Sequence, residues 1–398
     1  MARKKTKEEA VKKVVNEEVN TEKLIRGVTY DEPEVELSTA QEEIISSSFY
    51  DPKKTEIDLD GLASISKEVK KSTAFIDDTQ LRIIIDSYYQ AQKNRINIQN
   101  QIRAVAQGYD NTDNLPAMKW LLANYQNTEN QIKKMIESYT DSVPVCRWAK
   151  SIKGIGPIFA AILWDAINMD KCEHANQFLN YCGQNNNNIE WLGKEKAEKI
   201  VNDVYEELGL AKIEPVNDDI LIKICQKTNR NFSTVLRGFE DHKDRTPGND
   251  RTVLIKYLSK PPYNTDLKST CFLIGEAFCK VSNRGSLYGR LYRERKAWET
   301  IRNERGEYRE QAEKLLKEKN YDKSNPTYKC LIEGKLSPGH INQRAKRWAT
   351  KIFLTHFFEA CWVYKYGPGS KPPVIYPIAF QDHVDYIEPE VPYRKFIK

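Results

Sequence analysis

The sequence predicts an all-α fold, built from helical hairpins with a helix-hairpin-helix motif and a long amphipathic helix. Apolar residues recur at spacings of three, four or seven through most of the 398 residues, which is the period of one helix face. Gly, Pro and Asn/Asp clusters separate these runs, as expected at helix ends. No segment alternates strand and helix patterns, so a parallel α/β sheet is not expected.

Composition indicates a soluble protein of two or three domains. The longest apolar runs are too short or too interrupted to span a membrane, and no signal-like segment opens the chain, so we expect no membrane association and a cytoplasmic location. The eight cysteines are scattered without a Cys-x-x-Cys pair, and we expect them to be small buried residues. A net charge of +6 is only mildly basic, so local charge is more informative.

The N-terminal part divides into an arm and a hairpin. Residues 1–72 mix Lys and Glu with few aromatics, which predicts a charged flexible arm. Residues 73–140 carry two helical patterns separated by "GYDNTDNLP", a stretch with a Gly stop, Asx turn residues and a Pro near the next start. We therefore predict an antiparallel helical hairpin over 73–140.

A helix-hairpin-helix segment is predicted over residues 141–183, centred on "WAKSIKGIGPIFAAILWDAI". Gly154 and Gly156 supply unusual torsions and bare backbone, and Ile155 between them can enter the hairpin core. Pro157 suits the first position of the second helix. The sequence therefore predicts two helices that meet with almost no loop.

This turn is a candidate phosphate site. Backbone N–H groups at the turn and at the next helix N-terminus would point outward toward one anionic oxygen, and Lys150 and Lys153 would add positive charge. Such a site binds the nucleic-acid backbone without reading bases. The alternative is a helix corner whose glycines only permit close packing.

Residues 184–250 resemble a helical insertion. The polar loop "QNNNN" is followed by one amphipathic helix and then by "DDILIKICQKTNRNFSTVLRGF", a helix, short turn and helix. This last unit could read the major groove as a helix-turn-helix, but two small packing helices are favoured because no base-reading signature is present.

Residues 251–365 are predicted to form a helical core, followed by a Pro-rich extended tail over 366–398. A long amphipathic helix is expected within 288–319. From Lys335 to Phe358 there is no acidic residue, and the candidate DNA-binding cations here are Arg344, Lys346, Arg347 and Lys351. Spacings of three and four place Arg344, Arg347 and Lys351 on one helix face.

Four segments resemble, in order, the C-terminal domain of DEDD-type insertion-sequence transposases, the group that includes bridge-RNA-guided recombinases. They are "SIKGIGPIFAAILWDAI", "FLNYCG", "LKSTCFLIGEAF" and "INQRAKRWATKIFLTHFFEACWVYKYG". The resemblance covers residues 140–183 and 250–365 and is closest to stand-alone members carried by phages or plasmids. It implies a DNA-binding protein of a mobile element in a bacterial or phage-infected cell.

Two departures from that family bear on catalysis. The family's RuvC-like domain holds metal-binding carboxylates on strands, whereas here "TAFIDD", with Asp77 and Asp78, is the sole strand-like candidate and a helical pattern follows at once. The family's nucleophilic serine lies in a Ser-Gly stretch that the insertion replaces; the nearest serines are Ser233, Ser259 and Ser269. We therefore assign no catalytic residue, metal ligand or cofactor.

Three functions remain open. The first is a DNA-binding protein acting in recombination or transposition, non-catalytic alone, with a guide RNA or a separate nuclease subunit as candidate partners. The second is an active serine-type recombinase. The third is a helical structural protein without nucleic-acid binding, which could form a homo-oligomer through its hairpins. His356, among apolar residues, is expected to be a hydrogen-bonded core histidine.

Overall fold

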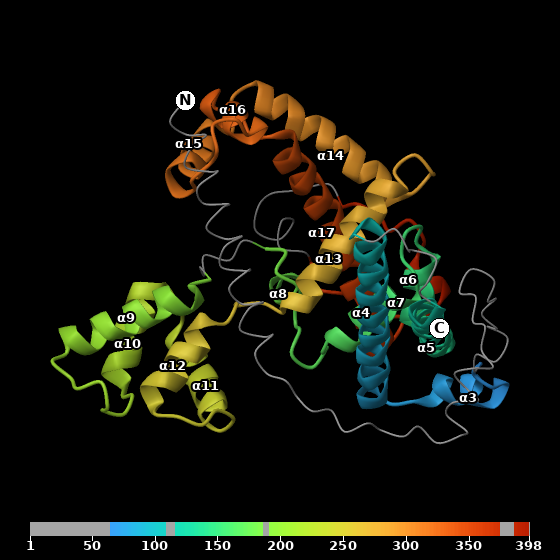
Figure 1. Cartoon of the computed structure of the whole chain (residues 1–398), viewed down its shortest axis with the longest axis horizontal. Coiled ribbons are helices and arrows are strands. Elements are labelled where there is room, and N and C mark those ends of the chain that lie inside the picture. The colour runs from blue at the N-terminus through green and yellow to red at the C-terminus, as the bar shows by residue number, and fades with distance from the viewer. Residues whose placement is uncertain (1–63, 109–115, 186–190, 375–385, 398) are drawn as a thin grey trace, which may run out of the picture. The chain divides into compact units, whose positions relative to one another are not determined.

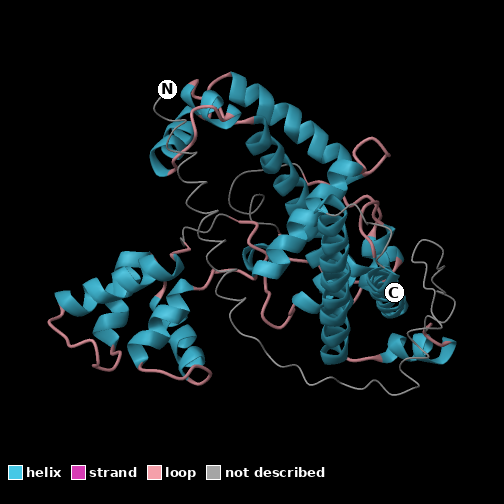
Figure 2. Ribbon diagram, viewed as in Figure 1, coloured by secondary structure: helices cyan, strands magenta, loops and turns pink. Residues whose placement is uncertain are grey.

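The computed structural model describes residues 64–108, 116–185, 191–374 and 386–397, and within these ranges the chain is helical with no strand (Figures 1 and 2). The all-α prediction is confirmed for this part of the chain. None of its helices is long and apolar enough to cross a membrane. The arm predicted over 1–72 falls outside the described residues up to residue 63.

The first half of the described chain contains the helices α3 Lys67–Ser72, α4 Asp78–Gly108, α5 Pro116–Ser142, α6 Pro144–Ser151, α7 Pro157–Ala166 and α8 Ala175–Tyr181. The central part contains α9 Gly193–Glu207, α10 Asp218–Thr228, α11 Phe232–Lys243 and α12 Asp250–Ser259. The remainder contains α13 Thr265–Lys280, α14 Leu287–Glu304, α15 Arg309–Glu318, α16 Pro326–Ile332 and α17 Pro338–Tyr366.

The largest buried cluster is centred on α17. This helix is buried on nearly every face between residues 353 and 363, where most of its residues are apolar. Trp148 of α6 is fully buried and stacks on Phe353 of α17, with ring centroids 6.2 Å apart. Contacts with α6, α8, α13 and α14 surround α17, so the segments of the transposase resemblance share one core.

α4 and α5 contact each other through polar side chains as well as apolar ones. Glu129 of α5 accepts hydrogen bonds from Gln92 at 3.1 Å and from Arg95 at 2.5 Å, both on α4. Leu81 of α4 and Ile136 of α5 are fully buried in the main cluster. The turn predicted between these helices, residues 109–115, lies outside the described residues.

The insertion has a hydrophobic core of its own, formed by α9, α10, α11 and α12. The boundary predicted at residue 250 is too early, because Val253, Leu254 and Leu258 of α12 belong to this core. Its flanks adjoin each other in the main core: the Asn264 N–H donates to the carbonyl of Tyr181 at 2.9 Å. The insertion therefore leaves and re-enters the main core at one place.

The long amphipathic helix predicted within 288–319 is two helices, α14 and α15. Gly306 adopts φ +78°, and its N–H donates to Asn303 while that of Glu307 donates to Arg302, which closes α14. Tyr308, after the break, joins Leu331 of α16 in a third buried cluster. The first helix therefore ends at the glycine, although the helical spacing of apolar residues continues past it.

The C-terminal tail residues 386–397 contact the main core and contain one 3-10 turn, Tyr393–Lys395, while 375–385 lie outside the described residues. The extended conformation expected over 366–398 stays a prediction. The Trp148 indole donates to the carbonyl of Val391 at 2.7 Å, and Ile397 is buried. His356 is 2% exposed, with one ring nitrogen 2.7 Å from the Ile387 carbonyl and the other 2.8 Å from the Tyr288 hydroxyl. The prediction of a hydrogen-bonded core histidine is confirmed.

Candidate nucleic-acid interface

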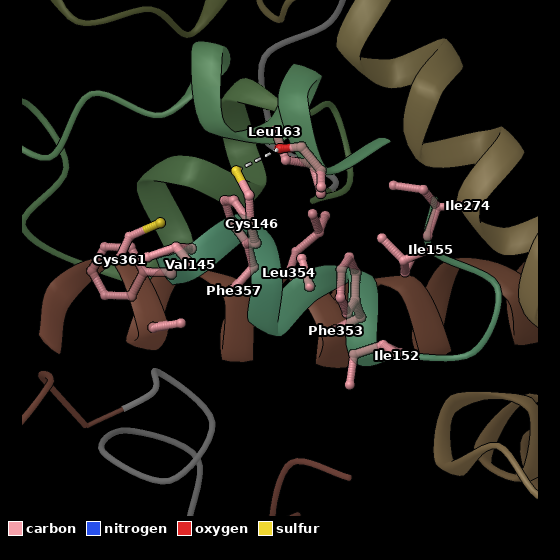
Figure 3. Close-up of a cluster of buried hydrophobic side chains, with 14 of the residues drawn as sticks. Val145, Cys146, Ile152, Ile155, Leu163, Ile274, Phe353, Leu354, Phe357 and Cys361 are labelled. Atoms are coloured by element: carbon pink, nitrogen blue, oxygen red, sulfur yellow. Dashed lines mark hydrogen bonds between the residues drawn. The ribbon is translucent and has the colours of Figure 1, made fainter. Parts of the chain in front are cut away.

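The turn over residues 152–156 joins α6 to α7 with little intervening chain. The Ile152 N–H donates to the carbonyl of Ala149 at 3.1 Å, and the Ile155 N–H donates to the carbonyl of Ile152 at 3.0 Å. Ile155 is 5% exposed and lies next to Ile274 of α13 (Figure 3). Ile155 therefore anchors the turn in the core, as the sequence predicts.

The two glycines of the turn have different roles. Gly154 adopts φ +100°, which favours glycine, and a side chain there would lie 3.5 Å from Ala277 and Val281. Gly156 adopts an extended φ of −98°, so the expected need for unusual torsions is wrong at this position. A Cβ on Gly156 would meet no atom within 4 Å. Gly154 is required by its positive φ, whereas Gly156 borders open space.

The open space at Gly156 adjoins the N-terminus of α7. Pro157 occupies the first turn of this helix, as predicted, and no side chain caps it. The first N–H groups of a helix have no partner within the helix, and they carry the positive end of its dipole. The space beside Gly156 is therefore open to an anionic oxygen at the start of this helix.

The two lysines predicted beside the turn already have partners. Lys150 forms an ion pair with Asp141, and its side chain is only 16% exposed. The Lys153 ammonium donates to the carbonyl of Arg284 at 2.8 Å but is exposed, and an ammonium has two further donors. Lys153 is therefore available to an anion, whereas the charge of Lys150 is neutralised.

Lys153 connects this turn to a second turn, residues 281–286, between α13 and α14. The second turn and the start of α14 present three exposed cations, Arg284, Arg290 and Arg293. The Arg293 guanidinium donates to the Asn283 side chain at 2.9 Å, and Arg290 lies 3.9 Å from Glu294. The role of these arginines could not be predicted from the sequence: "SNRGS" indicates a turn, but only the fold brings it to Lys153.

A hollow of about 470 Å³ lies beside the second turn. Its walls include Asn283, Arg290 and Arg293, and two glutamates of the C-terminal tail, Glu388 and Glu390. A Glu390 carboxylate oxygen accepts a hydrogen bond from the Leu287 N–H at 3.1 Å, at the N-terminus of α14. The hollow therefore already accommodates one carboxylate of the same chain.

Two of the four α17 cations that were predicted to bind DNA interact with carboxylates of the protein itself. Arg344 donates to Glu299 at 2.8 Å, and its guanidinium lies 4.5 Å from the ring centroid of Tyr308. Lys346 is 6% exposed and forms an ion pair with Glu276 of α13. Because Lys346 is buried between α17 and α13, its side chain cannot reach DNA. The assignment of Lys346 to DNA binding is wrong.

Glu299 of α14 is the buried carboxylate that binds Arg344. It is 1% exposed and accepts hydrogen bonds from Tyr308, Arg344 and Arg295. Burial alone would raise the pKa of Glu299, but the three donors hold it below its usual value. Arg344 is therefore a structural partner of a buried carboxylate.

Arg347 and Lys351 remain as candidates on α17. Arg347 is exposed and Lys351 is half-buried, and neither forms an ion pair within the described residues. Desolvation, followed by the nearby charge of Arg344, lowers the pKa of Arg347. Desolvation, followed by the charges of Arg347 and Arg295, lowers the pKa of Lys351. These two cations form a second positive patch without an anion of its own.

The residues considered for catalysis lie in ordinary structural positions. "TAFIDD" forms a 3-10 turn, Thr73–Phe75, directly before α4, so it is not a strand. The hydroxyls of Ser259 and Ser269 donate to carbonyls of their own helices, and that of Ser233 donates to Asn231. Across the described ranges, no three His, Cys, Asp or Glu side chains are grouped to hold a metal.

Comparisons with known proteins add no relative. No family model, curated protein or solved structure matches this chain. The geometry therefore carries the functional interpretation, and the likeness to transposases rests on the sequence segments quoted above.

Proposed function

We propose that this protein binds the phosphate backbone of duplex DNA through the turn 152–157 and the neighbouring turn 281–286. The observation that carries the proposal is the juxtaposition of the uncapped α7 N-terminus, open at Gly156, with the exposed Lys153, which is hydrogen-bonded to Arg284. Backbone N–H groups and flexible cations contact phosphates but do not distinguish bases. Binding should therefore show little sequence preference.

The second patch, Arg347 and Lys351, is a further phosphate contact in this proposal. Desolvation, followed by repulsion from neighbouring cations, lowers the pKa of both groups: Arg344 acts on Arg347, and Arg347 and Arg295 act on Lys351. A phosphate placed between them would relieve this repulsion. Removing them should therefore weaken DNA binding without a comparable loss of stability.

The biological role that we propose follows from the resemblance: the protein acts in DNA recombination or transposition, as a DNA-binding component that is non-catalytic alone. A separate nuclease subunit would supply the catalysis, and a guide RNA is the other candidate partner. Purification of the protein from its native host, followed by identification of bound nucleic acid and protein, tests this role. Recovery of neither would contradict it.

The binding proposal is tested by titrating a labelled duplex with wild type, K153A/R284A and R347A/K351A at several salt concentrations. Each double variant should bind more weakly for all sequences alike. The slope of log affinity against log salt should fall by about two, since each phosphate contact contributes about one.

The matched control is K317A/K323A, which also removes two positive charges. Lys317 of α15 and Lys323 of the loop after it are exposed and form no ion pair within the described residues. Its affinity should stay near that of wild type, apart from the general effect of net charge. Absence of binding at low salt, or equal losses in all three variants, would favour the interpretation of the turn as a packing corner.

A further inference from the structure

The C-terminal tail residues 386–397 contact the elements that border the proposed DNA site. The Val391 carbonyl accepts from Trp148 of α6, and the ring of Tyr393 meets the same indole edge-on, with centroids 6.3 Å apart. Tyr386 donates to Glu359 of α17 at 2.6 Å. The tail is therefore held at both ends of its described length, with its middle beside α14.

The middle of the tail carries the two acidic residues that line the 470 Å³ hollow. Glu390 accepts the Leu287 N–H, whereas Glu388 is exposed and forms no ion pair within the described residues. The lining also includes Arg290 and Arg293, together with Ser282, Asn283 and Gly285 of the turn that Lys153 contacts. A negative segment thus lies beside the turn 281–286, which the proposed function assigns to phosphate.

We propose that the tail is an autoinhibitory segment, in which Glu388 and Glu390 occupy the hollow beside the hairpin and DNA phosphate must displace them. The proposal rests on the proposed function, because it concerns the same surface. A carboxylate can take the place of a phosphate oxygen at backbone N–H groups and arginines. The docked tail then lowers DNA affinity, and a partner that held the tail elsewhere would raise it.

The test compares duplex affinity of the full-length wild type, E388Q and E388Q/E390Q at low salt. The substitution E390Q keeps an acceptor for the Leu287 N–H, so it changes charge and not shape. The double variant should bind about three- to thirtyfold more tightly, since each charge near a helix N-terminus is worth about 0.3–1 kcal/mol. E388Q changes a side chain for which no hydrogen bond is found among the described residues, and it should give part of this gain with unchanged melting temperature.

The matched control is E310Q/E313Q, which removes two exposed carboxylates of α15 that have no ion pair within the described residues. If the control gains as much as E388Q/E390Q, net charge explains the effect and autoinhibition is refuted. If wild type binds DNA but E388Q/E390Q binds no more tightly, Glu390 only caps α14. Autoinhibition is then refuted, and the proposed function stands. If no variant binds DNA, both proposals fall. Binding by E388Q/E390Q but not by wild type would support both.

Discussion

At the scale of single residues, Gly154 and Gly156 show how neighbouring glycines acquire different roles. Gly154→Ala should destabilise the protein by about 1–2 kcal/mol, because φ +100° is unfavourable for alanine. Gly156→Ala, at an extended φ beside open space, is the control and should change stability little. Urea unfolding of both variants measures the difference. Equal losses of unfolding free energy in the two variants would contradict the different roles of the two glycines.

Glu359 should make stability depend on pH. It is 4% exposed, and burial raises its pKa to about 7 despite the hydrogen bond from Tyr386, with the charge of Glu388 adding to the rise. A raised carboxyl pKa means that the folded state favours the neutral form. This stabilisation is fully present below the unfolded pKa of about 4.5 and is lost as pH rises through about 7.

The measurement is the melting temperature of wild type and Glu359→Gln between pH 5 and 8. Glutamine stays neutral and still accepts from Tyr386, so the variant should gain relative to wild type as pH rises. The comparison isolates Glu359 from His356, whose pKa burial lowers to about 4 and whose contribution has the opposite sign. A difference between the two proteins that stays constant with pH would refute the raised pKa.

At the scale of elements, packing of α11 against α12 depends on a close approach at Gly238. A Cβ there would lie 2.3 Å from the ring of Tyr257, whose hydroxyl donates to the Thr234 carbonyl. Gly238→Ala should therefore cost about 1–3 kcal/mol by forcing the ring to move. Glu240→Ala, exposed on the same helix, serves as the control in thermal unfolding. If Gly238→Ala melts at the same temperature as wild type, the helices accommodate the methyl group without loss of stability.

At the scale of the whole molecule, the insertion should be removable. Because Asn264 hydrogen-bonds to Tyr181 and the insertion has its own core, replacing residues 186–261 by a short Gly-Ser linker should leave the main core folded. Helical circular dichroism and melting of the shortened protein check this. Its duplex affinity should match that of wild type, because Lys153, Arg284, Arg347 and Lys351 are retained. A loss of cooperative melting would show that the insertion supports the main core.

The sequence by itself determined the all-α fold, the position of the turn 152–157, the burial of Ile155 and the hydrogen-bonded state of His356. These follow from local signals: apolar period, Gly and Pro at helix ends, and apolar neighbours. Over 288–319, the helical spacing of apolar residues predicted one helix where the structure has two. The spacing does not show that Gly306 ends the first helix.

Only the tertiary structure decided which cations are free. The spacing that placed Arg344, Arg347 and Lys351 on one face of α17 could not show that Glu299 of α14 would take Arg344. Nor could it show that Glu276 of α13 would bury Lys346. Likewise, Arg284 contacts Lys153 across 131 residues of sequence, and Glu390 contacts Leu287 across 103 residues. Charge availability depends on partners brought together by packing, and these long-range partners leave no periodic signal in the chain.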